Sequence, residues 1–163
     1  DKVLFIAESL LENENLKRSE IKYNKDILHQ SKLNTYFNGD FAKTKIEKDL
    51  NNFLKKIKKD KKYSISKKDI ILIESIRSDG IEISKKYDDL YEINESEIPT
   101  DIQVMINNNE IASTVLRIIE VIGQDELETL DEDTLYFIIS ALNQLNIDFI
   151  RNKILLKVLP LKV

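Results

Sequence analysis

The chain has 163 residues and no cysteine, which excludes disulfides, thiolate zinc sites and cysteine nucleophiles. Three glycines and two prolines are too few for a protein rich in β-turns or glycine-rich phosphate loops, and charged residues make up 33% of the chain, so we expect an all-α protein without a membrane span. The formal net charge of -4 conceals a segregation of charge: eleven lysines lie between Lys43 and Lys68, whereas twelve acidic residues and a single arginine lie between Glu92 and Asp133.

The first part of the chain carries three helical patterns. Apolar residues recur at helical spacing in Val3–Leu11, and a second helix is predicted for Ser19–Phe37. The turn Asn38-Gly39-Asp40 follows, with Gly39 suited to a left-handed conformation and Asp40 to a helix N-cap. The third helix, Phe41–Lys59, has the clearest apolar stripe, which consists of Ile46, Leu50, Phe53, Leu54 and Ile57.

A capping signal marks the next helix. Ser66, with Asp69 three residues later, predicts a capping box at the start of a helix that ends at Asp79. The stretch Ile81–Ser96 has no clear period, and we interpret it as either a short helix or an ordered loop.

The last part of the chain is predicted to be helical almost throughout. Thr100 and Gln103 are candidates for a second capping box, at the start of a short helix that ends near Asn107. The acidic loop Gln124–Glu128 is flanked by further helices, which we expect at Ile111–Ile122, Glu132–Leu145 with Asp131 as N-cap, and Asp148–Leu159.

The tail Ile154–Val163 is apolar on most sides, which is typical of a buried helix. Two interpretations stay open. The tail packs as the last element of the core, which we favour, or it presents an apolar patch to a partner or to a second copy of the chain.

Three turns resemble one another: Gly39-Asp40-Phe41, Asn109-Glu110-Ile111 and Ile147-Asp148-Phe149. In each, an acidic residue precedes a large apolar residue, and we expect Phe41, Ile111 and Phe149 to wedge between helices. The spacing of the turns fits a helical hairpin repeated every 35 to 40 residues, with Asp79-Gly80-Ile81 as a degenerate fourth turn.

The passage Leu33–Phe41 resembles the turn of the tetratricopeptide repeat, and the resemblance extends over Leu33–Leu54. It implies stacked antiparallel hairpins, a short α-solenoid of about seven to nine helices, with a concave face that binds peptides or proteins. A helical bundle of another family with the same turn chemistry is the alternative. We expect one domain over 1–163, with possible sub-units 1–64, 65–97 and 98–163.

The lysine-rich helix is the first candidate binding surface. Its lysines predict binding of an anionic partner such as nucleic acid, an acidic membrane surface or an acidic protein, although a solvated helix face is the commoner meaning of such a run. Tyr87 and Tyr91 are a second candidate, since tyrosines often line partner-binding grooves. The lysines concerned are Lys55, Lys56, Lys58, Lys59, Lys61 and Lys62.

Residues for catalysis or for metal binding do not form a recognisable set. His29 is the only histidine, with Asp26 three residues before it, and we expect it to be exposed or to cap a helix. The acidic run Asp125–Asp133 lacks the ligand alternation and the central glycine of a calcium loop. We therefore predict no catalytic residue, no metal site and no cofactor.

The sequence as a whole predicts a non-catalytic domain that binds another protein or a peptide. The alternatives are a module for an anionic polymer or membrane surface, and an accessory domain of a larger enzyme. Because the chain begins at Asp1, we expect a mature form or a piece of a longer or processed bacterial protein. The compartment stays open between cytoplasm and periplasm, because a targeting signal can precede Asp1.

Overall fold

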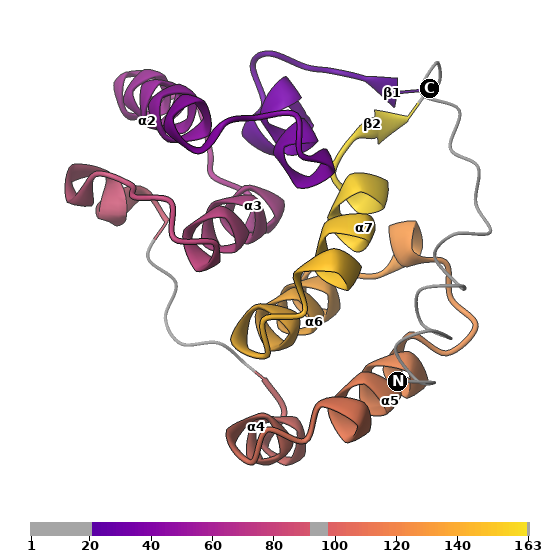
Figure 1. Ribbon diagram of the computed structural model, residues 1–163. Helices are drawn as coiled ribbons and strands as arrows, with labels where there is room; N and C mark the ends of the chain where they lie inside the picture. The colour runs from indigo at the N-terminus through magenta and orange to yellow at the C-terminus, as the bar shows by residue number, and fades with distance from the viewer. Residues whose placement is uncertain (1–20, 92–97, 163) are drawn as a thin grey trace.

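The computed structural model describes residues 21–91 and 98–162, and nearly all of their regular structure is helical (Figure 1). This confirms the all-α class, while the helix predicted for Val3–Leu11 lies outside the described residues. With η marking 3₁₀-helices, the helices are η2 (Leu28–Gln30), η3 (Lys32–Asn38), α2 (Lys43–Lys59), α3 (Lys67–Ser78), η4 (Lys85–Leu90), α4 (Thr100–Asn107), α5 (Ile111–Ile122), η5 (Leu127–Thr129), α6 (Glu132–Gln144) and α7 (Asp148–Val158). Two short strands, β1 (Ile21–Lys22) and β2 (Leu161–Lys162), pair antiparallel.

The centre of the fold is the packing of α3 against α6, with α7 lying against α6 and η3 (Figure 1). Helix α6 is buried on most sides, as its apolar sequence predicts. The predicted tail packs inside as far as Leu159, because Ile154, Leu155, Val158 and Leu159 are buried, whereas Leu161 is 44% exposed and Val163 lies outside the described residues. The tail is therefore the last element of the core.

The solenoid arrangement is not confirmed. In a solenoid each repeat contacts only its neighbours in the sequence. Here α7 packs against η3, more than a hundred residues earlier, and Ile21 pairs with Lys162 across the two strands. The end of the described chain thus returns to its beginning.

Helix α2 confirms the clearest sequence prediction. Ile46, Leu50, Leu54 and Ile57 are buried on one side, and the lysines lie on the other. Gly39 has the expected left-handed conformation, with φ of 82°. The predicted cap is wrong, because Ala42 rather than Asp40 is the N-cap.

The predicted helix Ser19–Phe37 is wrong. Its described part consists of β1 and then the 3₁₀-helices η2 and η3. Ser31 explains the break, because its hydroxyl donates to the carbonyl of Leu28 and accepts from the backbone N–H of Leu33, at 2.7 and 3.3 Å. Such local bonds compete with the backbone bonds of a continuous α-helix.

Of the three caps predicted after α2, two form and one does not. Ser66 and Asp69 make a full capping box at α3, and Asp131 caps α6. At α4 the N-cap is Pro99, without a side-chain hydrogen bond. Gln103, predicted to complete a box there, bonds instead to the side chains of Asn107 and Gln144.

Two of the three wedge residues lie partly as predicted. Phe41 and Ile111 are half-buried and pack against the core, but Phe149 is 44% exposed, so that prediction is wrong. The residue buried at this turn is Ile147, because Asn146 takes a left-handed φ of 56° and α7 begins at Asp148. Phe149 then falls on the outer side of the first helical turn.

Candidate functional site

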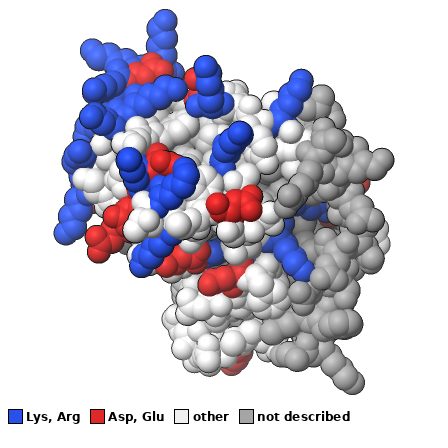
Figure 2. Space-filling model, turned by 45° about the horizontal axis from the view of Figure 1, so that its top comes forward, with Lys and Arg blue, Asp and Glu red and all other residues white. Residues whose placement is uncertain are grey.

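The lysines singled out from the sequence form one exposed surface at the C-terminal end of α2. We call it the basic surface, and it consists of Lys55, Lys56, Lys58, Lys59, Lys61 and Lys62, all of them exposed. The first four alternate with the buried residues Leu54 and Ile57 and therefore point outward. Figure 2 shows lysine and arginine side chains gathered on the side of the molecule where α2 lies in Figure 1.

Two lysines of the basic surface have acidic partners. Lys56 lies 3.2 Å from the carboxylate of Asp26, and Lys58 lies 3.1 Å from that of Asp89. Across the described part of the chain, the other four lysines have no carboxylate oxygen within 4.0 Å. Most of the charge on this surface is thus available to an external anion.

A shallow hollow of about 470 Å³ lies beside the N-terminal half of α2. We call it the aromatic hollow, since Tyr23, Phe41 and Phe53 line it together with Leu33. Its charged lining consists of Lys25, Lys32 and the ion pair of Lys45 with Asp49, and Tyr23 is 43% exposed. Sequence reasoning missed this hollow because Tyr23 comes from a segment predicted to be helical.

Lysine ammonium groups cover part of the aromatic surface in this region. The Nζ of Lys45 lies 5.0 Å from the centre of the Phe41 ring, and the Nζ of Lys56 lies 5.7 Å from that of Phe53. Both are within the range of cation–π attraction. Lys56 belongs to the basic surface and Phe53 to the aromatic hollow, so the two adjoin on α2.

Tyr87 and Tyr91 are largely buried rather than exposed at the surface, although Tyr87 still lines a shallow hollow together with Asn51 and Lys55. Their side chains are 3% and 4% exposed, because η4 folds the connection between α3 and α4 onto the core. The hydroxyl of Tyr91 donates to Asp88 at 3.0 Å, and burial together with this bond raises its pKa to about 12.

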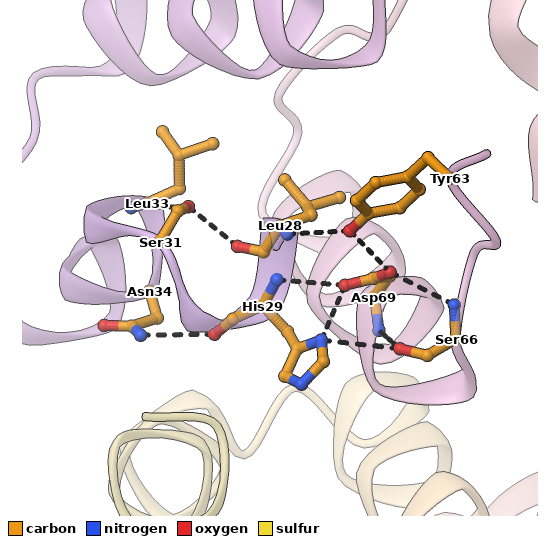
Figure 3. A network of polar contacts seen from close by, with 8 residues as sticks. All are labelled: Leu28, His29, Ser31, Leu33, Asn34, Tyr63, Ser66 and Asp69. Carbon is orange, nitrogen blue, oxygen red and sulfur yellow. Dashed lines mark hydrogen bonds and ion pairs between the residues drawn. The ribbon is translucent and has the colours of Figure 1, made fainter. Parts of the chain in front are cut away.

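His29 is buried rather than exposed, and its partner is Asp69 rather than Asp26 (Figure 3). The backbone N–H of His29 donates a hydrogen bond to Oδ1 of Asp69 at 2.9 Å, and the ring nitrogen Nδ1 of His29 lies 2.6 Å from the same oxygen. The Tyr63 hydroxyl donates to Oδ2 of Asp69 at 3.0 Å and accepts from the backbone N–H of Leu28 at 2.8 Å. This network fixes η2 on α3 and anchors the loop that carries Lys61 and Lys62.

The network lowers the pKa of Asp69. Burial by itself raises that pKa, but the hydrogen bonds from the His29 side chain and from the backbone N–H groups of Ser66 and His29 outweigh it. The carboxylate is therefore held ionised as a structural acceptor.

Ser66, His29 and Asp69 lie close together without forming a catalytic triad. The Ser66 hydroxyl is 3.4 Å from Nδ1 of His29, the same nitrogen that bonds to Asp69 (Figure 3). In a triad, serine and aspartate bond to opposite nitrogens of the ring, so that one nitrogen can take the serine proton while the aspartate holds the N–H of the other. Ser66 and Asp69 cap the start of α3, and the bonds of His29 to Asp69 hold η2 against this helix.

A second buried charge was missed from the sequence. The side chain of Arg151 in α7 is fully buried, and its guanidinium donates to both carboxylate oxygens of Asp79 at 2.9 and 2.8 Å. It also donates to the side chain of Asn143 and to the backbone carbonyl of Ser75. The sequence feature that could have revealed it is the position of Arg151 on the apolar stripe of α7, because a charged side chain buried there needs a buried partner.

Across residues 21–91 and 98–162, no three His, Cys, Asp or Glu side chains are grouped so that they could hold a metal ion. Within the same residues, no helix is both long enough and apolar enough to cross a lipid bilayer. No family model, curated protein or solved structure matches the chain.

Proposed function

We propose that this chain is a non-catalytic interaction domain that binds an acidic segment of a partner protein through the basic surface and the aromatic hollow. The observation that carries the proposal is the exposure of six lysines on and after α2, one of which, Lys56, adjoins a hollow lined by aromatic side chains. Lysines at the rim attract carboxylates over a distance, and an apolar pocket holds an anchoring side chain.

The hollow and the charges suit different parts of one peptide. A leucine or phenylalanine of the partner fills the space between Tyr23, Phe41 and Phe53, and acidic residues on one side of it contact Lys55, Lys56 and Lys59. The loop after α2 supports this arrangement. The hydrogen bonds of the Tyr63 hydroxyl to Leu28 and Asp69 fix the position of this loop, and with it the positions of Lys61 and Lys62 next to the helix.

A single-stranded nucleic acid is the second candidate, because the exposed ring of Tyr23 lies beside Lys25 and Lys32 and offers one stacking surface. An acidic peptide is favoured for two reasons. The basic surface contains no arginine for bidentate phosphate contacts. The rings of Phe41 and Phe53 are half-buried, and each already has an ammonium group near it.

Fluorescence anisotropy with a labelled Asp- and Glu-rich peptide containing one central leucine tests the proposal. The variant Lys55→Gln/Lys59→Gln should weaken binding roughly 2- to 30-fold, since each exposed charge pair contributes about 0.2–1 kcal/mol. The control variant Lys22→Gln/Lys43→Gln removes two exposed lysines outside the basic surface and should leave the affinity unchanged. Binding should also weaken as the salt concentration rises.

Competition separates the candidates. An unlabelled peptide should displace the labelled one, whereas a single-stranded oligonucleotide of equal charge and vesicles of anionic lipid should compete poorly. Equal affinities for wild type and Lys55→Gln/Lys59→Gln would refute the proposed site. Stronger competition by the oligonucleotide would assign the surface to nucleic acid, and stronger competition by the vesicles would assign it to a membrane.

A further inference from the structure

A shallow groove of about 440 Å³ lies on the outer side of the hairpin formed by α4 and α5. This hairpin is at the opposite end of the molecule from α2 (Figure 1). The groove combines apolar side chains with charges of both signs, and its lining consists of Asp101 and Met105 of α4 and of Ser113, Leu116, Arg117 and Glu120 of α5.

Helix α5 presents an exposed stripe along this groove. Ser113, Leu116, Glu120 and Gly123 are all exposed, and they recur at i, i+3, i+7 and i+10, the spacing at which the helices of a coiled coil meet. Leu116 is 49% exposed although it is large and apolar. Among the described helices, α4 packs most extensively against α5, and it leaves this stripe uncovered.

We propose that this stripe joins two copies of the chain, whose α5 helices pack antiparallel about a two-fold axis at the level of Ile118. The stripe is complementary to itself in this arrangement. Ser113 of each copy faces Gly123 of the other, and these small residues let the two helices approach closely. Leu116 of each copy covers the aliphatic part of Glu120 of the other.

Charge favours a second copy over an unrelated helix. Arg117 and Glu120 pair at 3.3 Å within one chain, yet their side chains stay 43% and 68% exposed. About the two-fold axis, Arg117 of each copy comes next to Glu120 of the other, so the unlike pair forms twice. Asp101 also lies 3.3 Å from Arg117, and each arginine is then placed between acidic groups of both copies.

The contact is small, because α4 and α5 have only 8 and 12 residues. Stable interfaces typically bury about 1,200–2,000 Å². We therefore expect single chains at low micromolar concentration and dimers as the concentration approaches millimolar. The basic surface lies away from this contact, and the proposal depends neither on that surface nor on its ligand (Figure 1).

Sedimentation equilibrium of the full chain over this concentration range tests the proposal. The wild type should approach twice the mass of one chain. Leu116→Asp should stay a single chain, because it places a second carboxylate opposite Glu120. Phe149→Asp is the matched control: Phe149 is 44% exposed but belongs to α7 and does not line the groove, so this variant should dimerise like the wild type.

A pair of charge reversals tests the antiparallel geometry. Arg117→Glu and Glu120→Arg each bring like charges together, and each alone should raise the dissociation constant roughly 10-fold or more, since the contact occurs twice per dimer. An equimolar mixture should dimerise again, because the new carboxylate at position 117 meets the new guanidinium at position 120. Lys48→Glu, which changes an exposed lysine of α2, controls for net charge and should leave dimerisation unchanged.

The mixture distinguishes contacts between copies from contacts within one chain, because neither variant regains its internal ion pair on mixing. A wild type that stays a single chain up to millimolar concentration would overturn the proposal. So would a Leu116→Asp variant that dimerises as well as Phe149→Asp, or a mixture that associates no better than its two components. Far-ultraviolet circular dichroism should be the same for all variants, since every change is at an exposed or half-exposed position.

Discussion

Replacing Arg151 by methionine should destabilise the fold by about 3 kcal/mol. The guanidinium is fully buried and its main partner, Asp79, has a side chain only 18% exposed. Removing one member of a buried ion pair typically costs about 3–5 kcal/mol, because the other charge is left without compensation. The partial exposure of Asp79 and its remaining hydrogen bond from the Tyr36 hydroxyl, at 2.8 Å, place the expected value at the lower end.

This loss is large compared with the total stability, which is typically about 5–15 kcal/mol for a domain. For a chain of this length, about 3 kcal/mol lowers the melting temperature by roughly 6–12 °C. Urea unfolding followed by circular dichroism should show a lower midpoint with an unchanged slope. Adding Asp79→Asn to Arg151→Met should restore part of the loss, because the unpaired carboxylate is then removed.

Arg117→Met is the matched control. Arg117 has ion pairs to Asp101 and Glu120, both at 3.3 Å, but it lies at the surface, so its replacement should cost less than about 1 kcal/mol. If Arg151→Met cost no more than Arg117→Met, the buried arginine would not be the connection between α7 and α3 that its contacts indicate.

Two further predictions concern the fold. A carboxyl with a lowered pKa stabilises the folded state at pH values above its unfolded pKa, here 3.8, and this contribution is lost as the pH falls through the pKa of the folded state. The difference in the free energy of unfolding between wild type and Asp69→Asn should therefore shrink below about pH 4, as measured by urea titrations. A constant difference across this range would contradict the lowered pKa. At the turn before α7, Phe149→Ala should change the free energy of unfolding by less than about 0.5 kcal/mol, whereas Ile147→Ala should cost about 2–5 kcal/mol. The reverse order would mean that Phe149 is the wedge.

Sequence periodicity predicted the helices whose stability comes from one apolar face. Helix α2 has its stripe and its charged face in register over 17 residues, and α5 begins and ends at the predicted residues. Periodicity failed between Ile21 and Asn38, where Ser31 redirects the backbone through bonds of its own hydroxyl. Short-range competition of this kind leaves no trace in the spacing of apolar residues.

The candidate site was predicted only where exposure follows directly from helical geometry. The lysines of α2 had to face outward once Leu54 and Ile57 faced inward. Tyr87 gave no such guide, because whether a tyrosine in an irregular segment lies in the core or at the surface depends on tertiary packing. The pairing of His29 with Asp69 spans 40 residues and arises only when η2 packs on α3.

An NMR titration of the labelled domain with the acidic, leucine-containing peptide tests the proposed binding site most directly. The backbone amide signals of residues 55–62, with those of Tyr23 and Phe53, should shift together and saturate at one peptide concentration. Shifts confined to α4 and α5, or no shifts at all, would contradict the proposal that α2 is where this protein meets its partner.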